Sequence, residues 1–208
     1  MIDLHNWLLF VGTVFVLSGT PGPNMLHVMT RSIALGARRS TATMAGCLTA
    51  LVLVLTASAA GMGAVLAASP RLFAVLRYAG VAYLLYLGVK AWRAPVADAG
   101  APPLQVPGGS ALRLYRGGMV IALSNPKLLL FAAAFLPQFV DQRAPAVPQF
   151  AILIATFAII EIFWMSCYAL GGQSIARLLT RPARQRGLNR LTGGIFAGFG
   201  ILLLTSKA

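Results

Sequence analysis

Two charged side chains, Lys127 and Glu161, lie inside long apolar runs of the sequence. A charge at the centre of a membrane-spanning helix costs about 2.5–3.5 kcal/mol even on a lenient insertion scale, so such a residue usually has a partner or a function. Lys127 could face a substrate carboxylate, pair with Glu161 or titrate, unless its long side chain simply reaches the membrane interface. Glu161 could carry a proton, because apolar surroundings disfavour its charged form, or it could hold two helices together through an ion pair or hydrogen bond.

Helix-breaking residues interrupt two of the apolar runs. Gly19-Thr20-Pro21-Gly22-Pro23-Asn24 contains two prolines without an N–H, and Ser124-Asn125-Pro126-Lys127 breaks a second run. Each run is therefore predicted to form two half-helices. Non-helical backbone at membrane depth persists only where it is buried in protein or lines a wet cavity, and a half-helix after the first break would direct free N–H groups into that cavity. The alternative is that the prolines merely kink these helices.

The residues at the two breaks could together bind a zwitterion. Free N–H groups at a helix N-terminus attract a carboxylate, and Asn24 is expected to be the N-cap residue that satisfies one of them. Ser124 and Asn125 offer donor and acceptor groups from the opposing break. His27 could titrate or contact substrate, although a lone histidine in a helix is more often a packing residue. The predicted substrate-binding residues are Pro21, Gly22, Pro23, Asn24, Ser124, Asn125, Pro126 and Lys127, and the predicted proton-coupling residues are Glu161, Lys127 and His27.

The composition indicates the solvent in which these helices fold. Of the 208 residues, 58% are apolar and 10% are charged, whereas soluble domains carry roughly 25% charged residues. Because a membrane span needs about 20 apolar residues, this length predicts a single all-α integral membrane domain of about six transmembrane helices. The expected spans cover about 6–36, 41–67, 71–92, 112–137, 148–170 and 191–205.

The spans divide into two halves, 1–93 and 112–208, joined by a linker at 94–111 that is rich in proline and glycine. Three spans in each half require the second half to be inverted relative to the first. The broken first span then corresponds to the broken fourth. Inverted halves with discontinuous helices at equivalent places are typical of secondary transporters, whose substrate site lies near mid-membrane.

The formal net charge of +13 is distributed unevenly between the connections. Basic residues concentrate in cytoplasmic loops, which predicts that the more basic side is cytoplasmic and both termini lie outside. Nucleic-acid binding is not expected, because the basic residues occupy short gaps between apolar runs. The segment 177–190 is interpreted as setting topology rather than binding anionic lipid. The predicted cytoplasmic side carries Arg31, Arg38, Arg39, Lys90, Arg93, Arg113, Arg116, Arg177, Arg181, Arg184, Arg186 and Arg190, and the other side carries Arg71, Arg77, Arg143 and Lys207.

Other functions lack the residues that they require. The sequence has no His-Glu-x-x-His, no Gly-x-Ser-x-Gly and no phosphate-binding Gly-x-x-x-x-Gly-Lys-Ser/Thr, which predicts that the chain is not an enzyme. Cys47 and Cys167 lack metal-site spacing and are expected to be small buried hydrophobes, so no metal or cofactor is predicted. The Gly194-x-x-x-Gly198 pair is expected to pack within the chain, although the sequence is compatible with a homo-oligomer. A passive channel or structural membrane subunit is the alternative function, because broken helices also line pores.

The break sequences resemble those of a known family. The stretches 19–24 and 124–127, followed by Phe131 and Leu136-Pro137-Gln138-Phe139, are similar to the LysE/RhtB family of amino-acid exporters. The similarity covers essentially the whole chain. It implies efflux of amino acids such as lysine, threonine, homoserine and cysteine-pathway metabolites across the bacterial inner membrane, driven by the proton gradient.

The resemblance also bears on the site. Glu161 and His27 are not among its motif positions and rest on the physical argument alone. Only one carboxylate is expected at membrane depth, which favours a neutral or weakly polar amino acid over a dibasic one as the substrate. The motif positions that the resemblance implies are Pro21, Gly22, Pro23, Asn125, Pro126 and Lys127.

Overall fold

The computed structural model describes residues 3–68, 75, 78, 81–82, 85–86, 88–94, 109–141, 144–172, 174 and 182–205. These residues form helices and their connections, with no strand among them, which confirms the all-α prediction for this part of the chain. The helices are α1 (Leu4–Gly19), α2 (Pro23–Leu35), α3 (Ala37–Ala68), α5 (Ala111–Leu123), α6 (Pro126–Leu130), the π-helix η1 (Phe131–Phe135), the 3-10 helix η2 (Leu136–Phe139), α7 (Ala146–Leu170) and α9 (Pro182–Thr205).

Both predicted helix breaks are present. The first separates α1 from α2, and the second separates α5 from α6. Pro23 and Pro126 each occupy the first helical position after a break, where the missing N–H costs no hydrogen bond. After α6 the chain passes into the π-helix η1 and then the 3-10 helix η2, so this span departs from regular α-helical geometry over most of its second half.

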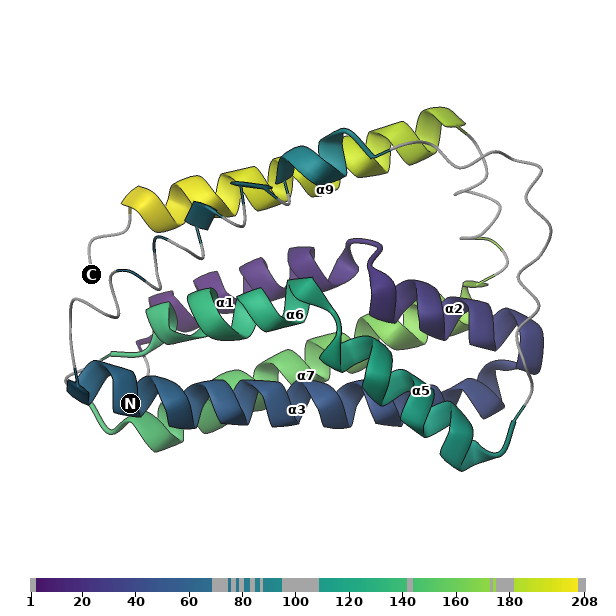
Figure 1. Cartoon of the computed structure of the whole chain (residues 1–208), viewed down its shortest axis with the longest axis horizontal. Coiled ribbons are helices and arrows are strands. Elements are labelled where there is room, and N and C mark those ends of the chain that lie inside the picture. The colour runs from purple at the N-terminus through teal and green to yellow at the C-terminus, as the bar shows by residue number, and fades with distance from the viewer. Residues whose placement is uncertain are drawn as a thin grey trace.

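Helix α3 packs against α5, α7 and α2. Helix α1 lies against α7, and α2 contacts both α7 and α5. Figure 1 shows α1 and α2 following one another across the molecule, with α9 on the far side of α1 and α6 from α3. The breaks therefore lie in the interior of the molecule, between α9 and the α3 layer.

Helices α3 and α5 cross at very short distance. A Cβ added at Gly46 would overlap the carbonyl of Tyr115, and one added at Gly118 would overlap the carbonyl of Thr43. Small residues at such crossings let membrane helices bring their backbones together. Cys47, buried as predicted, directs its Sγ to the Gly118 carbonyl oxygen at 3.4 Å.

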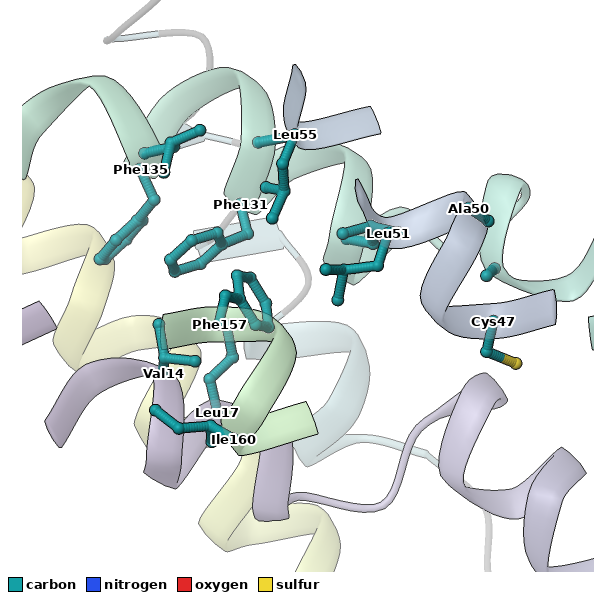
Figure 2. Close-up of a cluster of buried hydrophobic side chains, with 14 of the residues drawn as sticks. Val14, Leu17, Cys47, Ala50, Leu51, Leu55, Phe131, Phe135, Phe157 and Ile160 are labelled. Atoms are coloured by element: carbon teal, nitrogen blue, oxygen red, sulfur yellow. The ribbon is translucent and has the colours of Figure 1, made fainter. Parts of the chain in front are cut away.

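A cluster of buried apolar side chains joins α1, α3, α7 and η1 (Figure 2). The ring of Phe131 packs edge to face on Phe157 of α7, with 4.8 Å between the centroids, and stacks on Phe135 at 5.3 Å. Such aromatic pairs contribute about 0.5–1.5 kcal/mol each beyond the burial of their area. This packing holds η1 against α7 and thereby fixes α6, which directly precedes η1.

The exposed face of α7 is apolar, whereas its buried face contains polar groups. Gln149 is 1% exposed and Glu161 is 4% exposed. A soluble protein shows the reverse distribution, so the exterior of α7 is suited to lipid. Two described segments, Ala37–Gly61 and Ala146–Leu170, are long and apolar enough to cross a membrane, and α1 is apolar but shorter. The exposed residues of α7 are Ala146, Val147, Pro148, Ala151, Ile152, Ala155, Ile159, Ile162, Phe163 and Leu170.

Helix α9 begins earlier than predicted. It starts at Pro182 rather than near residue 191, so Arg184, Arg186 and Arg190 lie on a helix and not in a loop. Proline is tolerated in the first turn of a helix, and no further proline follows it in α9. Much of the third predicted span, 71–92, and of the linker, 94–111, lies outside the described residues, so the six-span inverted arrangement and the two halves remain predictions.

The glycine prediction for α9 is wrong. A Cβ at Gly194 or Gly198 would meet no described atom within 4 Å. The close contact is made instead by Gly193, whose added Cβ would lie 2.7 Å from the carbonyl oxygen of Gly88. Gly200, two turns further along, faces Leu85. Helix α9 therefore packs through the face that carries Gly193 and Gly200, which lies one residue away from the one predicted.

Candidate functional site

The two breaks meet at one cavity. Its volume is about 570 Å³, within the usual range for small-molecule sites. One wall comes from the breaks, and the other comes from residues 90–94 and α9. The larger part of the lining surface is apolar, and seven polar side chains also contribute to it. The lining residues are Thr20, Pro21, Gly22, Pro23, Leu26, Lys90, Ala91, Ala94, Asn125, Pro126, Lys127, Gln185, Leu188, Asn189, Thr192 and Phe196.

Lys127 binds the C-terminal end of α1. Its Nζ donates to the carbonyl oxygen of Leu17 at 3.0 Å and to that of Thr20 at 3.4 Å. The last carbonyls of a helix lack intrahelical partners and form the negative end of its dipole. An ammonium group there supplies hydrogen-bond donors and also places a positive charge at the negative end of the dipole. A helix end within a membrane must find such donors inside the protein. The cost of placing this cation at depth is thus offset without a direct contact to Glu161.

Two aromatic residues of α7 complete the same helix end. Trp164 Nε1 donates to the carbonyl oxygen of Phe15 at 2.9 Å, and the hydroxyl of Tyr168 donates to that of Gly19 at 3.0 Å. The hydroxyl of Thr20 donates a hydrogen bond to the carbonyl oxygen of Leu17 at 2.6 Å. The last turn of α1 is therefore held by donors from α6 and α7 as well as from its own chain.

Glu161 lies in a small pocket behind the cavity wall. The pocket is shared with Leu17, Asn24, Asn125 and Lys127, among others, and measures about 10 Å³, roughly the space of one water molecule. The carboxyl group lies within electrostatic reach of the Lys127 ammonium group, and the side chain of Asn24 lines the same pocket.

Ser18 Oγ and Asn24 Oδ1 are buried and have no hydrogen-bond partner among the described residues. An unpaired buried polar atom costs about 1–3 kcal/mol. The surroundings of the Glu161 carboxyl group therefore retain unused hydrogen-bonding capacity.

The N-terminus of α2 opens towards the cavity. Gly22 is its N-cap residue, and no side chain caps the helix. The prediction that Asn24 is the N-cap is wrong, because Pro23 takes the first helical position and Asn24 the second. The side chain of Asn24 turns instead into the Glu161 pocket. In α6, by contrast, the N-cap Asn125 accepts a hydrogen bond from the Lys127 amide at 3.0 Å.

The structure brings most, but not all, of the predicted site residues together. Asn24 and Glu161 share the small pocket with Lys127. Ser124 is the exposed C-cap of α5 and lines neither space. His27 lines a separate cavity between α2 and α5. The predicted residues that line the large cavity are Pro21, Gly22, Pro23, Asn125, Pro126 and Lys127.

Several cavity residues were not predicted from the sequence. Gln185, Asn189 and Thr192 of α9 all line the cavity, as does Lys90. Asn189 also donates through Nδ2 to the carbonyl oxygen of Ala94 at 3.1 Å. The sequence feature that could have identified the α9 residues is their spacing. Gln185, Asn189 and Thr192 are four and three residues apart, which places them on one face of a helix.

An all-helical chain with an apolar exterior, whose interrupted helices enclose a cavity lined by a half-buried lysine, is typical of membrane transporters. The chain belongs to the LysE type translocator family, whose model matches residues 15–207. This confirms the resemblance seen in the break sequences.

Among three similar proteins, two are named as efflux proteins. A homoserine/homoserine lactone efflux protein of Salmonella typhi is 34% identical over 203 residues, which cover 97% of each chain. A leucine efflux protein of Klebsiella pneumoniae is 33% identical over 213 residues, covering 98% of this chain and 96% of that one. An uncharacterized membrane protein of Vibrio cholerae is 32% identical over 210 residues and covers 100% of both chains. No solved structure matches this chain.

Proposed function

We propose that this protein exports a neutral amino acid across the bacterial inner membrane, with the cavity at the two breaks as the substrate site. The observation that carries this proposal is the position of Lys127, whose ammonium group lies at the cavity beside the uncapped N-terminus of α2. A substrate carboxylate at this point would meet both a cation and free amide groups.

The cavity lining favours a substrate with an uncharged side chain. Among the described lining residues the charged ones are Lys90 and Lys127, and none is acidic. A cationic side chain would therefore be desolvated without a partner, whereas Leu26, Leu188 and Phe196 offer apolar surface. The relatives named for homoserine and leucine efflux agree with this class of substrate.

We also propose that export is coupled to inward proton movement through Glu161, with Lys127 as the second group whose charge changes. Glu161 is buried, yet two residues of its pocket, Asn125 and Lys127, also line the cavity. The ammonium group of a zwitterionic substrate and a proton would neutralise the same carboxylate. They would compete for it, as the exchange of substrate for proton requires.

Transport assays distinguish this function from the passive-channel alternative. Purified protein in liposomes should show saturable efflux that proceeds uphill when a pH gradient is imposed. One proton moving through 100 mV releases about 2.3 kcal/mol, enough to raise the gradient of a neutral solute roughly fiftyfold. Flux that never saturates and only runs downhill would identify a pore.

Replacing Pro21 and Pro23 together with alanine should reduce export without preventing insertion. Alanine lets the helix continue through the break, which would remove the free amide groups at the start of α2. We expect at least about a tenfold lower rate at low substrate concentration, the effect of losing about 1.4 kcal/mol of binding free energy. Pro148→Ala, in the exposed first turn of α7, is the matched control. Parental export by a normally inserted double variant would show that the first break does not bind substrate.

We further propose that both termini lie outside the cytoplasm. Arg39 donates to the carbonyl oxygen of Gly109 at 3.3 Å, which supports placing the connections that follow the first and third predicted spans on one side. Fusions of alkaline phosphatase after Ala208 should be active, and green fluorescent protein inserted in 94–111 should fluoresce. An inactive phosphatase and a fluorescent reporter at the carboxyl terminus would reverse this orientation.

A further inference from the structure

We propose that the cavity lined by His27, Arg31 and Arg113 binds a phosphate group, supplied by an anionic phospholipid or as free phosphate. The cavity lies between α2 and α5 and has a volume of about 320 Å³. Leu114 and Gly117 complete its described lining. None of these residues lines the cavity at the two breaks, so this is a separate site.

Two adjacent glycines of α5 shape this cavity. Gly118 packs directly on the backbone of α3, which turns Gly117 towards α2. A Cβ added at Gly117 would lie 3.7 Å from His27 Nε2. The missing side chain thus leaves room beside the imidazole, and the two helices remain close enough for Arg31 and Arg113 to line the same space.

The charge of the lining favours an anion. Two guanidinium groups and an imidazole line the cavity, and none of the described acidic residues, Asp3, Asp141 and Glu161, is among its lining residues. Guanidinium groups present planar pairs of N–H donors that match the oxygen atoms of phosphate. Two of them on different helices can grip such a group from two sides.

The depth of the cavity suits the phosphate of a lipid head group. Arg31 follows the start of α2 by eight residues, or about 12 Å along the helix axis. If the break lies at mid-membrane, as the proposed function requires, this distance approaches half of the roughly 30 Å hydrocarbon layer. The guanidinium group would then lie where lipid phosphates begin.

Ligand-dependent thermal unfolding of the full-length protein in neutral detergent tests the proposal. Phosphatidylglycerol is compared with zwitterionic phosphatidylcholine, and sodium phosphate is compared with sodium chloride at equal ionic strength. Native mass spectrometry counts the lipid that stays bound. We expect phosphatidylglycerol, phosphate or both to raise the unfolding temperature. Arg31→Gln combined with Arg113→Gln should weaken the apparent affinity by about tenfold or more, as expected for lost hydrogen bonds between charged groups.

The control is Arg38→Gln combined with Arg116→Gln, which removes the same charge from exposed positions on α3 and α5. It should retain the parental response. A response to phosphatidylglycerol alone identifies lipid as the source, and a response to sodium phosphate identifies the free anion. If the Arg31→Gln, Arg113→Gln double variant does not fold, the Arg113→Gln single variant takes its place in the same thermal-unfolding measurement, and it should also show a weaker response to the ligand. No response by the parental protein, or an equal loss in the control, would overturn the proposal, since the basic residues would then act only as general surface charge.

Discussion

Lys127→Met is expected to abolish export and to destabilise the fold, whereas combining it with Glu161→Gln should restore part of the stability but not export. The methionine cannot donate to the carbonyl oxygens of Leu17 and Thr20. It also leaves the Glu161 carboxylate, 4% exposed, without the cation that faces it. Because the two groups are not in direct contact, we expect a cost of at most the about 3–5 kcal/mol that breaking a buried charge pair incurs by leaving one charge uncompensated. The second substitution removes that remaining charge.

Glu161→Gln alone separates coupling from substrate binding. The amide cannot take up a proton, so export should lose its response to an imposed pH gradient while exchange of substrate across the membrane continues. The measurement is substrate efflux from proteoliposomes with and without the gradient, accompanied by thermal unfolding of all three variants. If both Lys127→Met and Glu161→Gln keep full gradient-driven transport, neither residue carries the proton. His27 or another ion must then be considered.

The second large effect is expected at the crossing of α3 and α5, where Gly46→Ala should strongly destabilise the protein. The added Cβ would overlap the backbone carbonyl of Tyr115, and backbone cannot move aside as a flexible side chain can. Overpacking commonly costs about 1–3 kcal/mol and occasionally more, and a clash with backbone belongs at the upper end. Since α5 leads directly into the second break, any shift of this helix would also displace Lys127 from the end of α1.

Gly61→Ala in the same helix is the matched control, because a Cβ there meets nothing within 4 Å. Alanine is favoured over glycine within a helix by about 1 kcal/mol, so this variant should be as stable as the parent or slightly more so. Thermal unfolding and the monodisperse fraction after detergent extraction provide the comparison. Equal stability of the Gly46 and Gly61 variants would mean that the two helices do not cross at this distance. Gly118→Ala, which would overlap the Thr43 carbonyl from the other side, should repeat the Gly46 result.

The interruption of α1 shows how a helix end can be stable away from water. Its last carbonyls are bound by an ammonium group, an indole and a phenol that come from α6 and α7. The start of α2 has no equivalent side-chain cap. This asymmetry satisfies the acceptors of α1 and leaves the start of α2 without a side-chain cap, which is the arrangement that the proposed carboxylate-bearing substrate needs.

The sequence by itself determined the class of protein and the location of the breaks. A chain with 58% apolar residues must fold largely in lipid. The helix-breaking residues at 19–24 and 124–127 disfavour a continuous helix through either stretch, because a missing proline N–H is a property of the residue alone. Lys127 and Glu161 could be singled out for a similar reason, since the cost of desolvating a charge within an apolar run is evident from the sequence before any partner is known. The family followed from the same break motifs.

Only the tertiary structure decided which groups face one another. Lys127 binds Leu17, 110 positions earlier in the chain, and nothing local to either residue specifies that contact. Asn24 turns away from the cavity because Pro23 shifts the start of α2 by two residues. His27 faces α5 rather than the breaks, and the polar side of α9 forms the opposite wall of the cavity. These outcomes depend on how closely helices pack and on the angle at which each is rotated, which long-range contacts between side chains determine.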